Sequence, residues 1–189
     1  FYPREHLNSG YVILKQAENY LNEEKRISIA KQIIETAILN MIVVLKYYRK
    51  KGKNLDEYIS DIDEKLGQLK NSKTTNEIMA YEGNIREKYY KAFNIILENE
   101  DFKFTVRSKR PPKDKLNALI SFGNSMMYTS VLSEIYKTNL DPRIGYLHST
   151  NNRKFTLNLD VAEIFKPIIV DRVIFSVLNK KIITAKDFD

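Results

Sequence analysis

The sequence predicts an all-α protein, with several long helices arranged around a central buried one. Apolar residues recur at steps of three and four over long stretches, which is the spacing of a buried helix face. Only six glycines and five prolines interrupt the 189 residues, and the alternation typical of half-buried strands is scarce. The length fits one compact domain, in which we expect a helical lead-in over residues 1–70 and a core over residues 71–189.

Five or six helices are expected, and several of their ends carry recognisable signals. Ser9 and Asp114 are suited to helix N-termini, because their side-chain oxygens can accept a backbone N–H. Gly52 can adopt the left-handed conformation that commonly ends a helix. Pro167 cannot donate to the carbonyl of Glu163, so the last helix should bend there. The expected ranges are 9–21, 22–51, 55–69, 75–98, 115–137 and 156–180.

The helix expected over residues 115–137 is apolar almost all round. Such a pattern indicates the central buried helix of the fold. Met126 and Met127 are expected to fill space in the core.

Composition and charge narrow the classes of function. The excess of Lys and Arg gives a formal net charge of +7 and a pI near 9.3, which favours a polyanionic partner, most simply nucleic acid. With no cysteine, the chain has no disulfides, no thiolate metal sites and no cysteine nucleophile. No uncharged apolar run reaches the roughly 18–20 residues of a membrane helix, and the first residues, Phe-Tyr-Pro-Arg, have neither the apolar region nor the cleavage site of a signal peptide. We therefore expect a cytoplasmic protein with no membrane partner.

Glu82 and Gly83 are the first sign of a site. Glu82 falls in line with the apolar stripe of its helix, and burying an unpaired carboxylate costs several kcal/mol. Gly83 adds a mid-helix glycine, which costs about 1 kcal/mol relative to alanine. Two successive residues that are each unfavourable in a buried helix indicate a functional position. The alternative is that Glu82 lies at the edge of the stripe and pairs with Arg86.

A basic segment follows over residues 101–114. Five cations within residues 103–113 are as consistent with a phosphate-contacting loop as with an ordinary solvated one. Two further arginines and a lysine lie downstream. The candidate DNA-binding residues are Arg107, Lys109, Arg110, Lys113, Arg143, Arg153 and Lys166.

Two acidic residues and a histidine supply the remaining candidates. Asp160 and Glu163 are three residues apart, so they project from one side of the last helix, although an acidic pair near a helix start is also favoured by the helix dipole. A lone histidine such as His148 is more often structural than a ligand. Together with Glu82, however, these groups form an oxygen-rich set with one imidazole, which suits Mg²⁺ or Mn²⁺ at a phosphate-handling site. Without the ion, the clustered carboxylates should repel, so removing Glu82 or Glu163 could stabilise the metal-free fold.

Four sequence motifs resemble those of one known family. Residues 110–121 read Arg-Pro-Pro-Lys-Asp-Lys-Leu-Asn-Ala-Leu-Ile-Ser, similar to the RPP-x-D-x-x-NALLS signature of the CRISPR-associated integrase that inserts new spacers. Residues 82–86 resemble its Glu-Gly motif followed by an arginine. Residues 141–148 resemble its DP-x-IG-(F/Y)-LH segment, and residues 159–167 its LDLxExFRP segment. The four motifs occur in the order of the family.

The resemblance implies a helical catalytic domain with one divalent ion, Mg²⁺ or Mn²⁺. The ligands and catalytic residues of the family fall on Glu82, His148 and Glu163. Asp160 matches an additional acidic position, and Lys166 a basic position near the metal. Members join the 3′-hydroxyl ends of short DNA to a phosphodiester in the repeat array by transesterification, and they also cut branched DNA.

The resemblance also implies partners. Members carry an N-terminal β-rich domain that dimerises and binds a small CRISPR-associated partner protein. No strand-rich segment precedes the helices here, so we expect a fragment whose homodimer, partner binding and full activity are doubtful. The competing hypotheses are a related transposon-type integrase, a non-catalytic helical module that binds nucleic acid, and a helical domain whose charge serves solubility alone.

Overall fold

The computed structural model describes residues 9–148 and 155–188, and within these all regular structure is helical. The prediction of an all-α fold is therefore confirmed. The helices are α1 (Gly10–Leu21), α2 (Glu23–Lys50), α3 (Asp56–Leu69), α4 (Thr75–Lys91), α5 (Phe93–Leu97), α6 (Lys115–Ile135), α7 (Leu157–Phe165) and α8 (Arg172–Asn179), with short helical turns at Glu100–Phe102, Pro167–Asp171 and Ala185–Phe188.

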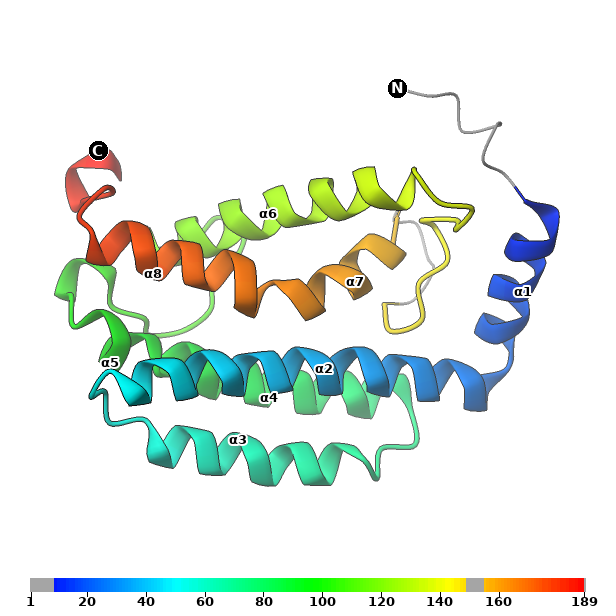
Figure 1. Ribbon diagram of the computed structural model, residues 1–189, viewed down its shortest axis with the longest axis horizontal. Helices are drawn as coiled ribbons and strands as arrows, with labels where there is room; N and C mark the ends of the chain where they lie inside the picture. Colours follow the sequence, from blue (N-terminus) through cyan, green and yellow to red (C-terminus); the bar gives the residue numbers. More distant parts are fainter. Residues whose placement is uncertain (1–8, 149–154, 189) are drawn as a thin grey trace.

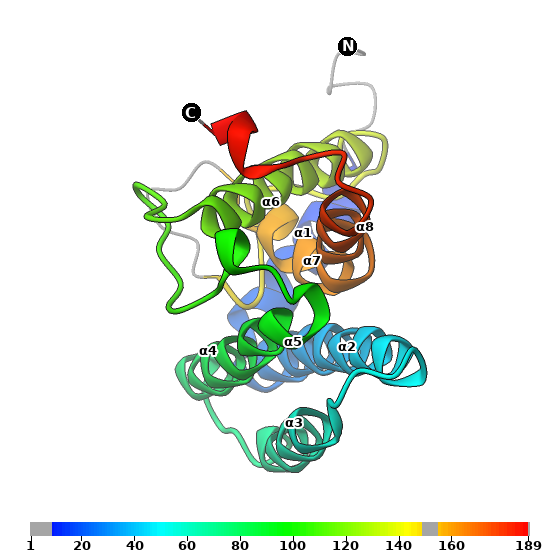
Figure 2. The same cartoon turned by 90° about the vertical axis from the view of Figure 1, so that its left-hand side faces the viewer.

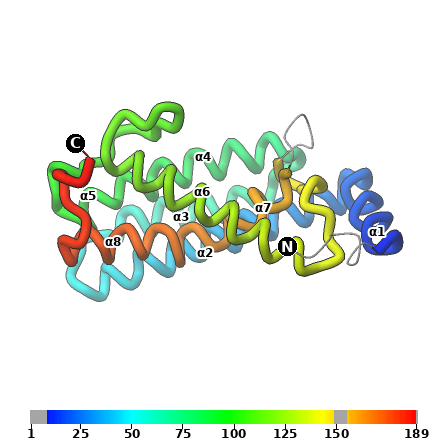
Figure 3. Tube along the Cα trace, turned by 90° about the horizontal axis from the view of Figure 1, so that it is seen from above, coloured from blue at the N-terminus to red at the C-terminus, as the bar shows by residue number. Residues whose placement is uncertain are grey.

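The helices stack in layers (Figure 1). α6 lies over α7 and α8, which in turn lie over α2 and α4, and α3 covers the opposite side of α2 and α4 (Figures 1 and 2). Seen from above, α6 runs lengthwise over α7 and α8 (Figure 3). α1 crosses one end of this bundle. The layers bring α4 and α7, which carry the candidate carboxylates, into the same interior.

α2, and not α6, is the central helix. It contacts α1, α3, α4 and α7, and the side-chain amide of Asn40 donates to the carbonyl of Ile164 over 2.8 Å. α6 packs on α7 with one face and leaves Phe122 67% and Met126 57% exposed on the other, although Met127 is buried. The prediction that residues 115–137 are buried all round, with Met126 in the core, is wrong because apolar composition does not specify which face is covered.

By length and composition, α2 is also the one described helix that could cross a membrane. A buried core helix passes the same test. Its buried residues face α3, α4 and α7, whereas Leu39, Val43 and Tyr47 are 46%, 58% and 43% exposed, so packing in the bundle accounts for part of its apolar character.

Two expected helices are interrupted. Residues 75–98 form α4 and α5, which meet at Ala92. Residues 156–180 form α7 and α8, joined by a π-helical turn that begins at Pro167 and in which the Asp171 amide donates to the Lys166 carbonyl over 3.0 Å. Pro167 thus changes the helix where it was expected to do so, but by widening one turn of the helix. The helix ends at Ser9, Gly52 and Asp114 agree with the expected caps.

Candidate functional site

Arg86 lies at the centre of the site and links α4 to α7. Its Nε donates to Glu82 one helical turn away, and its Nη2 donates to Oε2 of Glu163 over 2.5 Å. The Nζ of Lys166 donates to the other oxygen of Glu163, also over 2.5 Å. The side chains of Arg86, Glu163 and Lys166 are only 13%, 8% and 6% exposed. The alternative in which Glu82 pairs with Arg86 is therefore what the structure shows.

Glu82, Arg86, Glu163 and Lys166 form a cluster in which two negative charges are matched by two positive ones. Burial alone would raise the pKa of Glu163, but Arg86 and Lys166 lower it to about 2. Burial opposes the charge on Arg86 and Lys166, yet the neighbouring carboxylates raise the pKa of both. Glu163 is accordingly ionised at neutral pH with a cation on each oxygen. The expected repulsion between uncompensated carboxylates does not fit this arrangement, because Arg86 lies between Glu82 and Glu163 and Lys166 bonds to Glu163.

Asp160 holds the segment that carries His148. Its carboxylate is fully buried and accepts the backbone N–H groups of Tyr146 (2.5 Å), Leu147 (2.9 Å) and His148 (3.1 Å). It also lies 2.7 Å from Nδ1 of the His148 ring. A Cβ atom on Gly145 would lie 2.9 Å from the Asp160 carboxylate, so only glycine fits this close turn. Asp160 thus orients His148.

The predicted ligands come near one another without forming a metal site as placed. His148 lies near enough to Glu163 to make a minor contribution to its lowered pKa, after Arg86 and Lys166. Within residues 9–148 and 155–188, no three His, Asp or Glu side chains are grouped closely enough to hold an ion. The Arg86 guanidinium occupies the place of a cation between Glu82 and Glu163.

The donor set nevertheless fits a divalent ion. Carboxylate oxygens with one imidazole suit Mg²⁺ or Mn²⁺. A histidine that binds a metal usually engages its other ring nitrogen with a carboxylate, which fixes the orientation of the ring. Asp160 provides this contact at Nδ1 of His148 and leaves Nε2 available.

Asp171 is a member of the cluster that the sequence did not indicate. It is 1% exposed, and neither of its oxygens has a hydrogen-bond partner in the described part of the chain. The hydroxyl of Tyr89 and Nη1 of Arg86 likewise form no hydrogen bond of normal geometry there, although the Tyr89 hydroxyl lies beside Asp171 and influences its pKa. Burial raises the pKa of Asp171 to about 7, against the influence of Arg86, Tyr89 and Lys166. In an α-helix, residues 166 and 171 would point in different directions, so the π-helical turn was needed to bring Asp171 to this side.

The basic segment is anchored to the core. Phe102 and Phe104 are both 2% exposed, and the backbone of Phe104 exchanges two hydrogen bonds with the side chain of Asn94 (2.7 and 2.9 Å). Arg107 donates to Oδ1 of Asn117 over 2.8 Å and to Oγ of Ser121 over 2.9 Å. Its guanidinium therefore organises the segment.

The other predicted DNA-binding residues fall into two groups. Lys109, Arg110 and Lys113 are exposed and form no ion pair within the described residues. Although Lys109 is exposed overall, partial desolvation of its ammonium group and the Arg107 guanidinium lower its pKa, whereas Glu82 and Glu163 raise it.

Three predicted cations differ from this exposed group. Lys166 is buried against Glu163 and lies 4.7 Å from the centre of the Tyr128 ring. Arg143 bonds to Asp141 over 2.7 Å. Arg153 lies outside the described residues.

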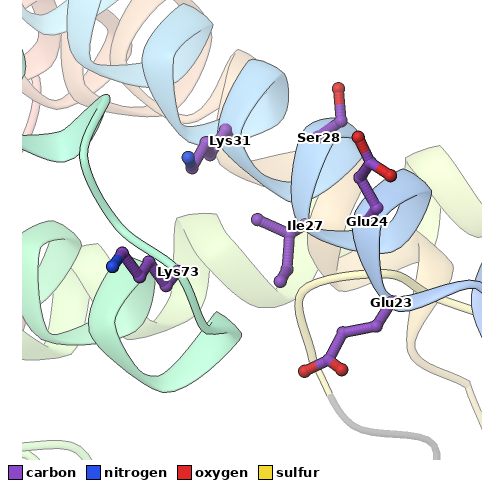
Figure 4. A pocket seen from close by; sticks show the side chains of 6 residues that line it. All are labelled: Glu23, Glu24, Ile27, Ser28, Lys31 and Lys73. Atoms are coloured by element: carbon purple, nitrogen blue, oxygen red, sulfur yellow. The ribbon is translucent and has the colours of Figure 1, made fainter.

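Two hollows lie away from this cluster. One, of about 560 Å³, is lined by both acidic and basic side chains, including Glu23, Glu24 and Lys73 (Figure 4). The other, of about 600 Å³, lies at the bundle end that faces the viewer in Figure 2. Its cations Lys51 and Lys180 follow the C-terminal ends of α2 and α8, where positive charge offsets the helix dipoles. Neither hollow contains a predicted site residue.

Comparison with known proteins gives a consistent result. The family model described as "CRISPR associated protein Cas1" matches residues 1–189. A CRISPR-associated endonuclease Cas1 of Thermodesulfovibrio yellowstonii is 61% identical over 100% of this chain and 57% of the relative. The structure of a Cas1 protein from Thermotoga maritima has a TM-score of 0.89 and 48% identity, covering 98% of this chain and 58% of that one.

A second solved structure is a casposase bound to its integration product. It has a TM-score of 0.84 and 26% identity over 96% of this chain and 51% of the casposase chain. This chain thus spans little more than half the length of the relatives it matches. Since the family model covers every residue and the candidate site has the family's motifs in order, the chain belongs to the CRISPR-associated Cas1 family.

Proposed function

We propose that this chain is the catalytic helical domain of a metal-dependent DNA endonuclease and integrase that inserts new spacers into a CRISPR array by 3′-hydroxyl transesterification. The observation that carries the proposal is the pair of carboxylates, Glu82 and Glu163, held together by Arg86 beside an oriented His148. The relatives named as endonucleases support nuclease chemistry. The casposase bound to its integration product supports strand transfer on this fold.

Glu82, His148 and Glu163 would hold Mg²⁺ or Mn²⁺. When bound, the ion would neutralise phosphate charge and activate a water or a 3′-hydroxyl for in-line attack. Arg86 and Lys166 keep Glu163 ionised, so this carboxylate carries the negative charge that a metal ligand needs at neutral pH. Asp160 favours the His148 tautomer that carries its proton on Nδ1, which leaves a lone pair on Nε2.

The exposed cations of the basic segment would hold the nucleic acid. Lys109, Arg110 and Lys113 have no carboxylate bound to them among the described residues, so their charge is available to phosphates. Glu82 and Glu163 raise the pKa of Lys109, so this lysine would contact the phosphate at the reaction centre. Arg107 supports this segment through Asn117.

The proposed partners are branched or double-stranded DNA and, as the family resemblance implies, a second copy and the small CRISPR-associated partner. The alternative of a transposon-type integrase is favoured by the casposase likeness alone. Both alternatives use the same cluster, so they differ in the DNA target and not in the chemistry of the site.

The test is metal-dependent turnover on branched DNA. Glu82→Ala, His148→Ala and Glu163→Ala should each abolish Mn²⁺-dependent cleavage and strand transfer while DNA affinity changes little. Asp63→Asn, a change at an exposed position on α3, is the matched control and should retain full activity. DNA binding with no cleavage by the unaltered protein in Mn²⁺ or Mg²⁺ would favour the non-catalytic module.

A further inference from the structure

Asp171 and Arg86 are incompletely bonded neighbours inside the same buried cluster. Arg86 uses Nε and Nη2 for Glu82 and Glu163, while its buried Nη1 has no partner in the described chain. Both oxygens of Asp171 are also unbonded there. A buried donor and a buried acceptor left without partners each cost about 1–3 kcal/mol, so such a combination needs an explanation.

No ion pair joins the two groups in the present arrangement, but both belong to the same buried neighbourhood. The charge of Arg86 lowers the pKa of Asp171, and Tyr89 lies three residues after Arg86 on the same face of α4, beside the same carboxyl. The π-helical turn after Pro167 fixes Asp171 on the side that faces this cluster. π-helical turns of this kind are frequent at functional sites.

The present contacts of Arg86 obstruct cation binding. Its guanidinium lies between Glu82 and Glu163, and a divalent cation at these carboxylates would add charge to a cluster that is already balanced. The guanidinium must therefore leave at least one glutamate, and a buried guanidinium can do so only if another acceptor is in reach. Asp171 is a buried carboxyl whose oxygens form no hydrogen bond of normal geometry in the described chain, and the Tyr89 hydroxyl beside it leaves acceptor capacity on the second oxygen.

We propose that Asp171 is a positioning residue that provides a second acceptor for the Arg86 guanidinium and thereby frees Glu82 and Glu163 to bind a divalent cation. The inference rests on the proposed function for the identity of the cation, but the alternative pairing of Arg86 is a property of the protein itself. It assigns Asp171 a role distinct from that of Asp160, which already accepts several donors.

A metal-free experiment tests the pairing directly. Glu82→Gln removes a partner of Arg86 that does not contact Lys166, so Arg86 should turn to Asp171. We expect Asp171→Asn alone to leave the Tm unchanged or higher in EDTA, but to lower it by roughly 5 °C or more in the Glu82→Gln background. The same effect of Asp171→Asn in both backgrounds would overturn the proposal. Should the double variant fail to fold while both single variants fold, the pairing is supported.

Ion binding provides the second measurement. Calorimetric titration with Mn²⁺ should show an affinity about tenfold lower for Asp171→Asn than for the unaltered protein, which corresponds to about 1.4 kcal/mol. Asp63→Asn should bind as the unaltered protein does. Equal Mn²⁺ affinity in Asp171→Asn would overturn the proposal. An unaltered protein that binds no Mn²⁺ would refute the metal of the proposed function, and the metal-free comparison would then decide the pairing alone.

Discussion

Replacing Glu163 by glutamine removes the carboxylate to which both Arg86 and Lys166 are bonded. Its oxygens lie 2.5 Å from a nitrogen of each cation, and its side chain is 8% exposed. The pKa of Glu163 falls from 4.5 to about 2 on folding, and at about 1.4 kcal/mol per pKa unit this corresponds to roughly 3 kcal/mol of stability. Removing one partner of a buried pair costs about 3–5 kcal/mol, which agrees with this magnitude.

The pH dependence has a defined sign. Because the folded pKa is lowered, the stability from Glu163 is present above pH 4.5 and is lost as the pH falls toward 2. In EDTA at pH 7.5, Glu163→Gln should lower the Tm by about 10 °C, since a chain of this size loses about 2–4 °C per kcal/mol. Urea denaturation from pH 8 down to pH 3 should show the difference from the unaltered protein shrinking below about pH 4.5. If Glu163→Gln were as stable as the unaltered protein at pH 7.5, the bonds of Glu163 to Arg86 and Lys166 would not stabilise the fold. Mutual repulsion of the carboxylates would then be the better description.

Four further predictions concern the residues around the cluster. Burial raises the pKa of Asp171 from 3.8 to about 7. The loss of stability caused by ionising this buried carboxyl is therefore absent below pH 3.8 and grows up to about pH 7. Asp171→Asn should therefore gain up to about 4 kcal/mol at pH 8 and little at pH 4, as measured by urea denaturation; an equal gain at both pH values would contradict this. Gly145→Ala should lower the Tm by several degrees and weaken Mn²⁺ binding, since the new Cβ would lie 2.9 Å from the Asp160 carboxylate; an unchanged Tm would show that the turn can yield. Gly83→Ala meets no atom within 4 Å and should stabilise α4 by about 1 kcal/mol, so a lower Tm would reveal an unseen contact. Lys109→Ala should weaken binding to branched DNA and reduce the slope of log K against log salt by about 0.9, whereas an unchanged slope would remove Lys109 from the DNA path.

The sequence specified the helices better than their assembly. Periodicity located every long helix, because it reports the face that each one buries. It did not identify α2 as the central helix, since burial depends on which neighbours cover a face. The breaks at Ala92 and Pro167 were missed or only partly anticipated, because apolar spacing continues across them.

The sequence predicted most residues of the candidate site, but not most of the hydrogen bonds and ion pairs between them. Glu82 stood out because a carboxylate interrupted an apolar stripe, and its pairing with Arg86 followed the i,i+4 spacing. The second bond of Arg86, to Glu163, joins residues 77 positions apart, so no local pattern could indicate it. Asp171 escaped notice for the same reason, since only the π-helical turn brings it to the cluster.

The most direct test of the central claim is a crystal structure of the protein soaked in Mn²⁺. We expect one anomalous peak within about 2–2.3 Å of oxygens from Glu82 and Glu163 and of Nε2 of His148, with the Arg86 guanidinium moved to Asp171. Saturating Mn²⁺ with no peak at these residues, and Arg86 still joining the two glutamates, would contradict the account.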